Sequence, residues 1–216
     1  MKKQIVSIFL CCCLIAALFP ATVSADSTDS ITVGGVTLDA GAPYLANGAG
    51  TAGSVKPDSG GYAFFDAATG TLTLHDAVIN GAASDTENYG IYSESDITVA
   101  LEGSSRITAG DAATSALQWR GDSKGFFLNN AALTVSGSGS LTIRGGKGAS
   151  SYGIYAQGVT IKDTAEVSIT AGCADASAPG VCYSCGIFPA GKHAPSTAAP
   201  MSQLSAAQLR VKMQQA

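Results

Sequence analysis

Short segments in which apolar and polar residues alternate recur along most of this chain. The clearest are six triplets of the form apolar–Thr–apolar, or close to it: 97–99 (ITV), 107–109 (ITA), 133–135 (LTV), 141–143 (LTI), 159–161 (VTI) and 167–169 (VSI). Such alternation is typical of a β-strand with one buried face, because successive side chains point to opposite sides. The spacings of three and four residues that an amphipathic helix needs do not occur in this region. The pattern predicts an all-β chain of very short strands.

A tetrapeptide marks the period of this pattern. YGIY occurs at 89–92 and at 152–155, a degenerate copy KGFF lies at 124–127, and a last copy CGIF lies at 185–188, after which the pattern fails. Each of the first three copies is followed by two of the triplets. A unit of about 30 residues with three short strands cannot bury a face alone, so the units are expected to stack as a β-solenoid.

Stacking of like on like predicts which apolar residues form continuous inward columns. The expected columns are Ile91, Phe126, Ile154 and Ile187; Val99, Val135 and Ile161; and Ile107, Leu141 and Val167. The threonines of the triplets would then point outward, where β-branched side chains suit a pleated surface. A β-sandwich is the rival arrangement, because short strands at regular intervals fit it as well. The likeness between the units favours the solenoid.

The two ends of the array depart from the pattern. We interpret 26–81 as an N-terminal cap with the first coil, 82–188 as the repeats and 189–216 as an irregular tail. Caps are expected because open strand edges would otherwise pair with other molecules. In the tail, Ser205 and Gln208 have capping-box spacing, which predicts a short helix from about Ala206. An array that has been cut short, with a vestigial or out-of-frame tail, is the alternative.

The first 25 residues have the features of a secretory signal peptide. Lys2 and Lys3 precede an apolar stretch at 5–19, and the small residues of TVSA lead to a cleavage site after Ala25. The apolar stretch is about 15 residues, shorter than the roughly 20 that span a bilayer. We therefore expect a secreted protein with an extracellular location, free or associated with a cell surface, and no membrane segment after cleavage.

Charge narrows the range of partners. Cleavage at Ala25 would remove two of the 12 Lys and Arg and none of the 16 Asp and Glu, so the net charge of the remainder is 10 − 16 = −6. Nucleic acids and anionic membranes both require a positive surface, and the sequence has no basic cluster. The composition therefore argues against both kinds of partner.

Three long stretches resemble a known group of proteins. They are YAFFDAATGTLTLHDAVING at 62–81, YGIYSESDITVALEGSSRITAG at 89–110 and SYGIYAQGVTIKDTAEVSITAG at 151–172. Together they are similar to secreted bacterial carbohydrate-binding-domain proteins with a right-handed parallel β-helix, an architecture related to the pectate-lyase-like solenoids. The resemblance covers about residues 31–188. It implies a right-handed parallel β-helix and a polysaccharide or other glycan as the partner.

The acidic residues give little support to catalysis. Enzymes on such solenoids use acidic clusters with calcium and a basic residue, or paired carboxylates. Here the only concentrations are Glu94 with Asp96, and Asp163 with Glu166 beside Lys162. Exposed acidic residues are common in turns, and we interpret both groups in that way. No residue is assigned a catalytic role, although a polysaccharide lyase or hydrolase stays as a distant alternative.

Metal ligands and cofactor motifs are not recognisable either. His75 and His193 are far apart in the sequence, and Cys182 and Cys185 form a lone C-x-x-C, whereas a zinc site of this type needs a second pair. With Cys173, three cysteines would remain after cleavage, which allows at most one intramolecular disulfide. We predict no metal and no cofactor.

The aromatic residues supply the candidate binding site. If the isoleucine of the tetrapeptide faces inward, the next residue faces outward, which places Tyr92, Phe127, Tyr155 and Phe188 in one row about 5 Å apart. The lone Trp119, in the insertion between the first two units, would extend or cover this row. Aromatic rings pack on the C–H faces of sugars, so the row is a candidate glycan platform. The alternative is a packing cluster covered by loops.

The first position of the tetrapeptide varies more than the others. It holds Tyr89, Lys124, Tyr152 and Cys185, and we expect it to be the least constrained of the four. Taken together, the sequence predicts a secreted, non-catalytic β-solenoid that binds a glycan. A structural or adhesin-like spacer without selective binding is the alternative.

Overall fold

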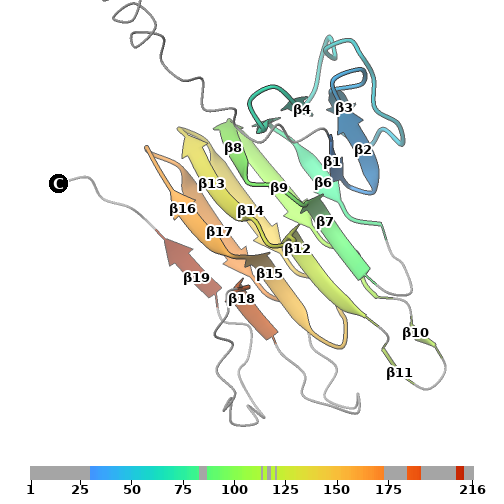
Figure 1. Ribbon diagram of the computed structural model, residues 1–216, viewed down its shortest axis with the longest axis vertical. Helices are drawn as coiled ribbons and strands as arrows, with labels where there is room; N and C mark the ends of the chain where they lie inside the picture. The colour runs from blue at the N-terminus through green and yellow to red at the C-terminus, as the bar shows by residue number, and fades with distance from the viewer. Residues whose placement is uncertain are drawn as a thin grey trace, which may run out of the picture.

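All the regular secondary structure that could be assigned is β. The computed structural model describes residues 30–82, 87–112, 114–115, 118–119, 121–172, 184–190 and 208–211, and within these ranges every element is a strand (Figure 1). The all-β class predicted from the alternation is therefore confirmed. The predicted signal peptide at 1–25 lies outside the described residues.

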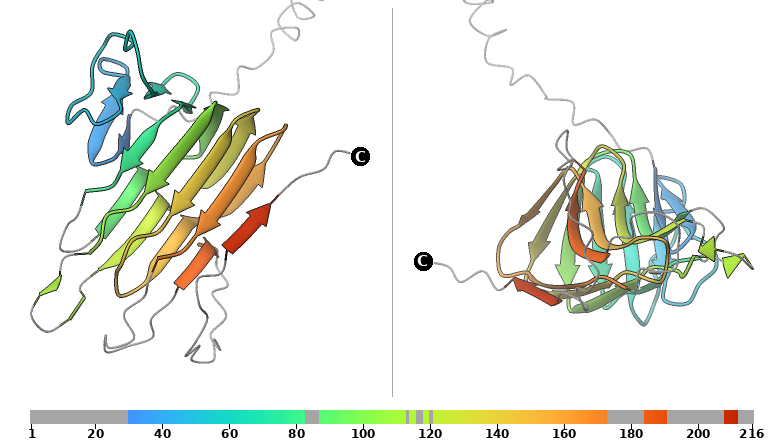
Figure 2. Two further views of the ribbon diagram at one scale, coloured as in Figure 1. Left: turned by 180° about the vertical axis from the view of Figure 1, so that it is seen from behind. Right: turned by 90° about the horizontal axis from the view of Figure 1, so that it is seen from below.

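From β7 onward the chain visits three sheets in turn. The first sheet contains β7 (Glu87–Ser93), β12 (Asp122–Leu128), β15 (Ser151–Ala156) and β18 (Ser184–Pro189). The second contains β8 (Ile97–Glu102), β13 (Ala132–Gly137) and β16 (Gly158–Ile161), and the third contains β9 (Ser104–Thr108), β14 (Ser140–Arg144) and β17 (Glu166–Thr170). Equivalent strands are adjacent and parallel in every sheet (Figures 1 and 2). A sandwich of antiparallel sheets would not pair them in this way.

Antiparallel strands occupy the N-terminal end of the first two sheets. β1 (Ser30–Val33) and β2 (Val36–Asp39) form a hairpin whose turn residues Gly34 and Gly35 have φ of 59° and 83°, as a tight two-residue hairpin turn requires. β1 then pairs with β7. In the second sheet, β3 (Tyr44–Ala46), β4 (Tyr62–Asp66) and β5 (Thr71–His75) form an antiparallel meander. β5 and β6 (Val78–Asn80) join β8 and β9 in parallel.

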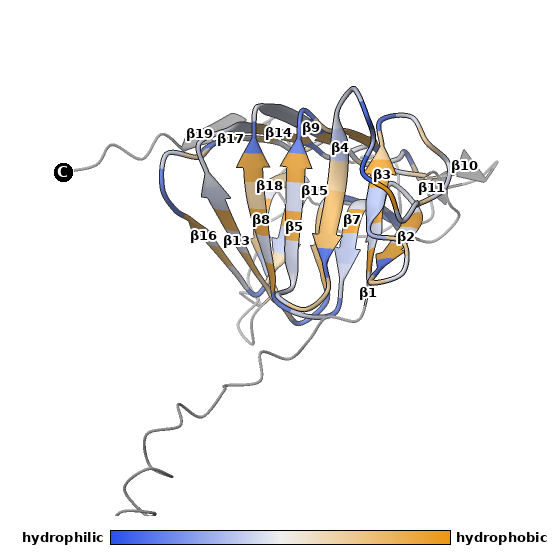
Figure 3. Cartoon of the chain, turned by 90° about the horizontal axis from the view of Figure 1, so that it is seen from above, coloured by the Kyte–Doolittle hydropathy of each residue, from blue (hydrophilic) through white to orange (hydrophobic). Residues whose placement is uncertain are grey.

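One apolar core lies between the three sheets, and the alternation builds it. Figure 3 shows apolar and polar bands along the strands of the second sheet, and the inward residues of all three sheets belong to one buried cluster. The register confirms two predicted columns. In the first sheet Phe126 pairs with Ile91 and Ile154, and in the second sheet Val135 pairs with Val99 and Ile161.

The third predicted column is wrong by two residues. Ile107 pairs with Ile143, and Leu141 pairs instead with Ser105 on one side and Val167 on the other. The sequence pattern predicts the wrong register because the inward position of β9 that pairs with Leu141 holds a serine, Ser105. Ser105 is buried, and its hydroxyl accepts a hydrogen bond from the backbone N–H of Ala77 at 3.0 Å, so the polar group is satisfied.

The predicted helix in the tail is also wrong for the residues that are described there. Gln208–Val211 form strand β19, which pairs antiparallel with β17 at the edge of the third sheet. In this register Leu209 lies opposite Ile169 and Val211 lies opposite Val167, so the alternation of the tail matches that of the sheet. Backbone pairing to an open edge overrides the local helix propensity, which is a weak preference.

Candidate functional site

The four aromatic residues predicted to form a platform lie in one row across the first sheet. Phe127 pairs with Tyr92 on β7 and with Tyr155 on β15, and Tyr155 pairs with Phe188 on β18. Successive ring centroids are 5.3, 5.5 and 5.3 Å apart. All four side chains are half-buried. We call these residues the aromatic row.

A second row runs beside the first because the tetrapeptide breaks the alternation. A Cβ on Gly90 would overlap Cγ2 of Ile107, so this glycine faces the core, and the next residue, Ile91, is also fully buried. Two successive inward positions place the first and fourth residues of the tetrapeptide on the same outer side. The rings of Tyr89 and Tyr92 accordingly stack at 5.1 Å. We call Tyr89, Lys124, Tyr152 and Cys185 the flanking row.

The flanking row is tightly packed, which corrects the expectation that its position is the least constrained. Tyr152 is 5% exposed and Lys124 is 4% exposed. The Tyr152 ring lies 5.6 Å from that of Tyr155 and 5.2 Å from that of Phe188. The variation at this position is therefore a choice among side chains that fill the same space beside the aromatic row.

Lys124 places a cation inside this aromatic surface. Its Nζ lies 4.1 Å from the centroid of Phe127 and 5.5 Å from that of Tyr155. A cation at this distance from a ring face is attracted by the ring quadrupole. The Asp122 carboxylate, 3.6 Å from Nζ, balances the charge. The lysine thus fits between rings where the other copies hold a tyrosine or a cysteine.

Tyr92 ends the aromatic row with a polar contact. Its hydroxyl donates a hydrogen bond to the exposed carboxylate of Glu94. Burial, together with the hydrogen bond to the Glu94 carboxylate and its negative charge, raises the pKa of Tyr92 to about 12. The hydroxyl is therefore a hydrogen-bond donor at neutral pH and is unsuited to act as a base.

Trp119 does not continue the aromatic row along the first sheet. Its backbone belongs to β11 (Gln118–Trp119), which pairs only with β10 (Thr114–Ser115) in a separate two-stranded sheet among the described strands (Figure 1). The assignment of Trp119 to the platform stays a prediction, because no contact of its ring is part of the described structure.

Several acidic side chains tie neighbouring turns together. The Asp96 carboxylate accepts a hydrogen bond from the N–H of Ala132 at 2.7 Å, and that of Asp163 accepts one from the N–H of Gly137 at 3.0 Å. Asp76 does the same for the N–H of Ser104 at 2.8 Å. Each bond crosses from one unit to the next. These carboxylates satisfy backbone donors at the turns, which gives them a structural role.

The thiols and imidazoles do not assemble a metal site within the described residues, where no group of three His, Cys, Asp or Glu side chains could hold an ion. Cys185 carries a free thiol that donates to the carbonyl oxygen of Ile187 at 2.9 Å. Cys173, Cys182 and His193 lie outside the described residues.

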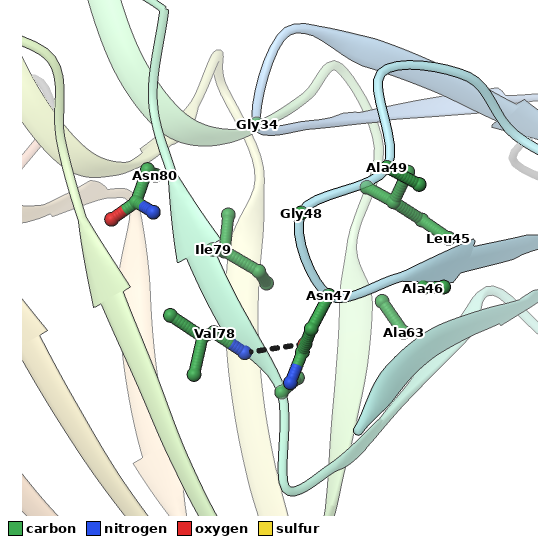
Figure 4. Close-up of a pocket in the computed structure, with 11 residues that line it drawn as sticks. Gly34, Leu45, Ala46, Asn47, Gly48, Ala49, Ala63, Val78, Ile79 and Asn80 are labelled. Carbon is green, nitrogen blue, oxygen red and sulfur yellow. Dashed lines mark hydrogen bonds between the residues drawn. The ribbon is translucent and has the colours of Figure 1, made fainter. Parts of the chain in front are cut away.

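A cavity of about 210 Å³ lies between β6 and the loop after β3 (Figure 4). The Asn47 side chain closes one side of it, accepting from the N–H of Val78 at 2.8 Å and donating to the carbonyl oxygen of Asp76 at 3.0 Å. Gly34 and Ile79 line the opposite side, and the lining has no charged side chain. The volume is below the roughly 300–1,000 Å³ of typical small-molecule sites. We attribute this cavity to the packing of the N-terminal strands.

Sequence reasoning missed a second group of aromatic side chains on the outer face of the second sheet. Tyr44 and Phe64 stack with centroids 4.7 Å apart, and Tyr62 stacks on His75 at 5.1 Å. A partial signal is present in the sequence, because Tyr62 and Phe64 alternate with the inward residues Ala63 and Phe65 on the strand that leads into the DAATG turn. The contribution of Tyr44 depends on a strand pairing that spacing alone does not show.

Comparisons of the chain with family models, with curated proteins and with solved structures find no match. Among the described residues there is no helix long and apolar enough to cross a membrane.

Proposed function

We propose that this protein is a secreted, non-catalytic glycan-binding protein built as a right-handed parallel β-helix. The β-helix is supported by the order in which the chain visits the sheets, since each unit adds one strand to each sheet in parallel register. Stacked units present rows of equivalent side chains on an extended surface, and such rows suit a linear ligand.

The observation that supports glycan binding is the aromatic row itself. Four half-buried rings from four adjacent strands follow one line across the first sheet. Three strand spacings of roughly 4.8 Å give the row a length of about 14 Å, enough for a short oligosaccharide. Sugar rings offer apolar C–H faces to aromatic side chains, and the repeat along the row is close to the size of one sugar unit.

Polar groups beside the row complement the rings. Glu94 and Asn129 are exposed near Tyr92, and the partly exposed Asp122 lies beside Lys124. Carboxylates and amides that converge on an apolar surface fix the orientation of hydroxyl-rich ligands. Because the chain has a net negative charge and no basic cluster, the expected partner is a polysaccharide or other glycan of a cell surface or matrix.

A structural spacer is the second candidate function, and the ring geometry favours it. The planes of Tyr155 and Phe188 are only 12° apart, and those of Tyr89 and Tyr92 are 26° apart, so these rings pack face to face on one another. Ring faces that stack on one another stabilise the sheet and are partly unavailable to a ligand.

A paired substitution separates the two functions. In Tyr92→Leu/Tyr155→Leu, leucine keeps much of the apolar volume and removes two flat ring faces. We expect wild-type protein to bind members of a glycan array and the variant to bind them about 5- to 150-fold more weakly, because each of the two lost ring contacts is worth roughly 0.5–1.5 kcal/mol.

The matched control is Thr142→Ala, an exposed position on the third sheet. It should leave binding unchanged, and thermal unfolding of all three proteins checks that the fold is retained. Glycan binding that survives the double substitution in a folded protein would contradict the platform. If the wild-type protein binds no glycan, the result would support the structural spacer as the function.

A further inference from the structure

The outer face of the second sheet carries an aromatic cluster that is separate from the aromatic row. We call Tyr44, Tyr62, Phe64 and His75 the second-sheet cluster. They come from three adjacent strands, β3, β4 and β5, which lie side by side in Figure 3. Tyr44 lies opposite Phe64, and Tyr62 lies opposite His75. The rings form a continuous chain, since Tyr44 and Tyr62 also meet edge to face at 6.0 Å.

Strand alternation forces these rings to the outside. On β4, Ala63 and Phe65 are 1% exposed and fill the core, so Tyr62 and Phe64 project from the opposite face. On β5, the buried Leu72 and Leu74 play the same part, which leaves His75 outside. The cluster is not part of the main core: the His75 side chain is 40% exposed and Tyr44 and Phe64 are half-buried, whereas Tyr62, between them, is 7% exposed.

Charged and polar side chains lie at the Tyr62–His75 end of the cluster. The Nδ1 of His75 lies 3.2 Å from Oε2 of Glu102, and these two side chains are 40% and 58% exposed. Nζ of Lys56 lies 5.1 Å above the Tyr62 ring, and the Tyr62 hydroxyl raises the pKa of Lys56 by hydrogen bonding. One positive and one negative group therefore lie beside this pair of rings.

A flat surface of hydroxyl groups extends from the cluster across the sheet. Thr71 pairs with Thr98, Thr98 with Thr134, and Thr134 with Thr160, so this outward row is threonine from β5 to β16. On β4 the same row holds Asp66. The neighbouring outward row, which continues from Phe64, holds Thr73, Ala100 and Ser136. These side chains are shorter than the rings of the cluster, so the cluster projects further from the sheet than the neighbouring threonine and serine hydroxyl groups.

We propose that the second-sheet cluster is a second saccharide-binding site, specific for neutral sugar units. The exposed parts of the Tyr44 and Phe64 rings offer apolar surface to the C–H face of a pyranose, and the imidazole, the carboxylate and the threonine and serine hydroxyl groups suit its hydroxyl groups. A polyanion would meet Glu102 and Asp76, and a polycation would meet Lys56. The ligand class rests on the proposed function, and the consequence is new: two sites on different sheets make the protein bivalent and able to bridge two glycan chains.

Calorimetry with defined oligosaccharides tests this site. The probes are cellohexaose, mannohexaose and chitohexaose, with hexagalacturonate as the charged comparison. Wild-type protein should bind one of the neutral probes with a stoichiometry of two. The variants Tyr92→Leu/Tyr155→Leu and Tyr44→Leu/Phe64→Leu should each bind it with a stoichiometry of one. The control Thr142→Ala should retain a stoichiometry of two.

A spectroscopic signal tests the second site without altering any residue of the cluster in the protein that is titrated. The chain has two histidines, so the imidazole resonances can be assigned with His75→Gln. In the Tyr92→Leu/Tyr155→Leu protein, the His75 resonance should shift on saturation with the neutral probe, and hexagalacturonate should leave it unchanged.

Two results would overturn the inference in different ways. If Tyr44→Leu/Phe64→Leu binds with wild-type stoichiometry and the His75 resonance does not move, the second site is absent and the aromatic row is the only platform. If wild-type protein binds none of the neutral probes and no glycan on an array, the proposed function itself fails, and the second site fails with it.

Discussion

The aromatic surface of the first sheet depends on single residues whose chemistry differs from that of their neighbours in the stack. Tyr92 bonds to Glu94, whereas Phe127 in the equivalent position has no hydroxyl and receives the Lys124 cation instead. Equivalent positions in stacked units thus keep the ring and vary the polar partner. A linear ligand would meet a different hydrogen-bonding group at each unit, which is a source of register and specificity.

Stability at high pH should depend on Tyr92. Its pKa is about 12 in the folded chain, against 10.0 as the ordinary value, so the folded state holds this proton more tightly than the unfolded state. That contribution is complete below pH 10 and is lost as the pH rises towards 12. Urea unfolding across this range should show a steeper fall in the free energy of unfolding for wild-type protein than for Tyr92→Phe, and identical slopes would contradict the assignment.

At the scale of the strand, the inward glycine of the tetrapeptide determines the shape of the first sheet. It allows two successive residues to face the core, and on β7, β12 and β15 it lies against an isoleucine of the third sheet. Two outer rows result, and both contribute to the aromatic surface. In a strand with strict alternation, the first and fourth residues of the tetrapeptide would lie on opposite faces, so one of the two rows would be buried.

Gly125→Ala should therefore be costly. The added methyl group would overlap Cγ2 of Ile143 and the backbone oxygen of Gly153, and we expect a loss of about 1–3 kcal/mol in the free energy of unfolding. Gly50→Ala is the matched control, because a Cβ there meets no atom within 4 Å. Equal urea midpoints for the two variants would show that the strand relaxes without cost.

At the scale of the whole molecule, the core is a set of columns with a middle and an end. Val135 is completely buried between neighbours on both sides, whereas Val159 and Ile161, on the last strand of the second sheet, are only half-buried. A side chain that is already partly hydrated loses less apolar burial on truncation than one that is fully buried. The end strand should therefore tolerate changes that the middle does not.

Two identical substitutions compare the middle with the end. Val135→Ala should lower the free energy of unfolding by about 2 kcal/mol, because it removes fully buried methyl groups and leaves a cavity. Val159→Ala should cost less than half as much, since its side chain is already partly hydrated. Chemical denaturation of the two variants measures both values, and equal losses would mean that other parts of the chain cover the end strand as fully as the middle.

The sequence by itself determined the β class and most of the core. Alternation and the spacing of the tetrapeptide are local properties, and they placed Ile91 beneath Phe126 and aligned Tyr92 with Phe127. Ser105 shows the limit of such reasoning, because a buried serine is recognisable only from its bond to Ala77, which lies 28 residues away.

Only the tertiary structure decided the remaining features. The strand at Gln208–Val211 forms because the third sheet offers an open edge, and local propensity predicts a helix there. The flanking row faces outward because an isoleucine of another sheet occupies the space behind the glycine. The second-sheet cluster combines residues from separate strands whose pairing no local pattern encodes. In each case the deciding contact is long-range, and a period read along the chain contains no information about it.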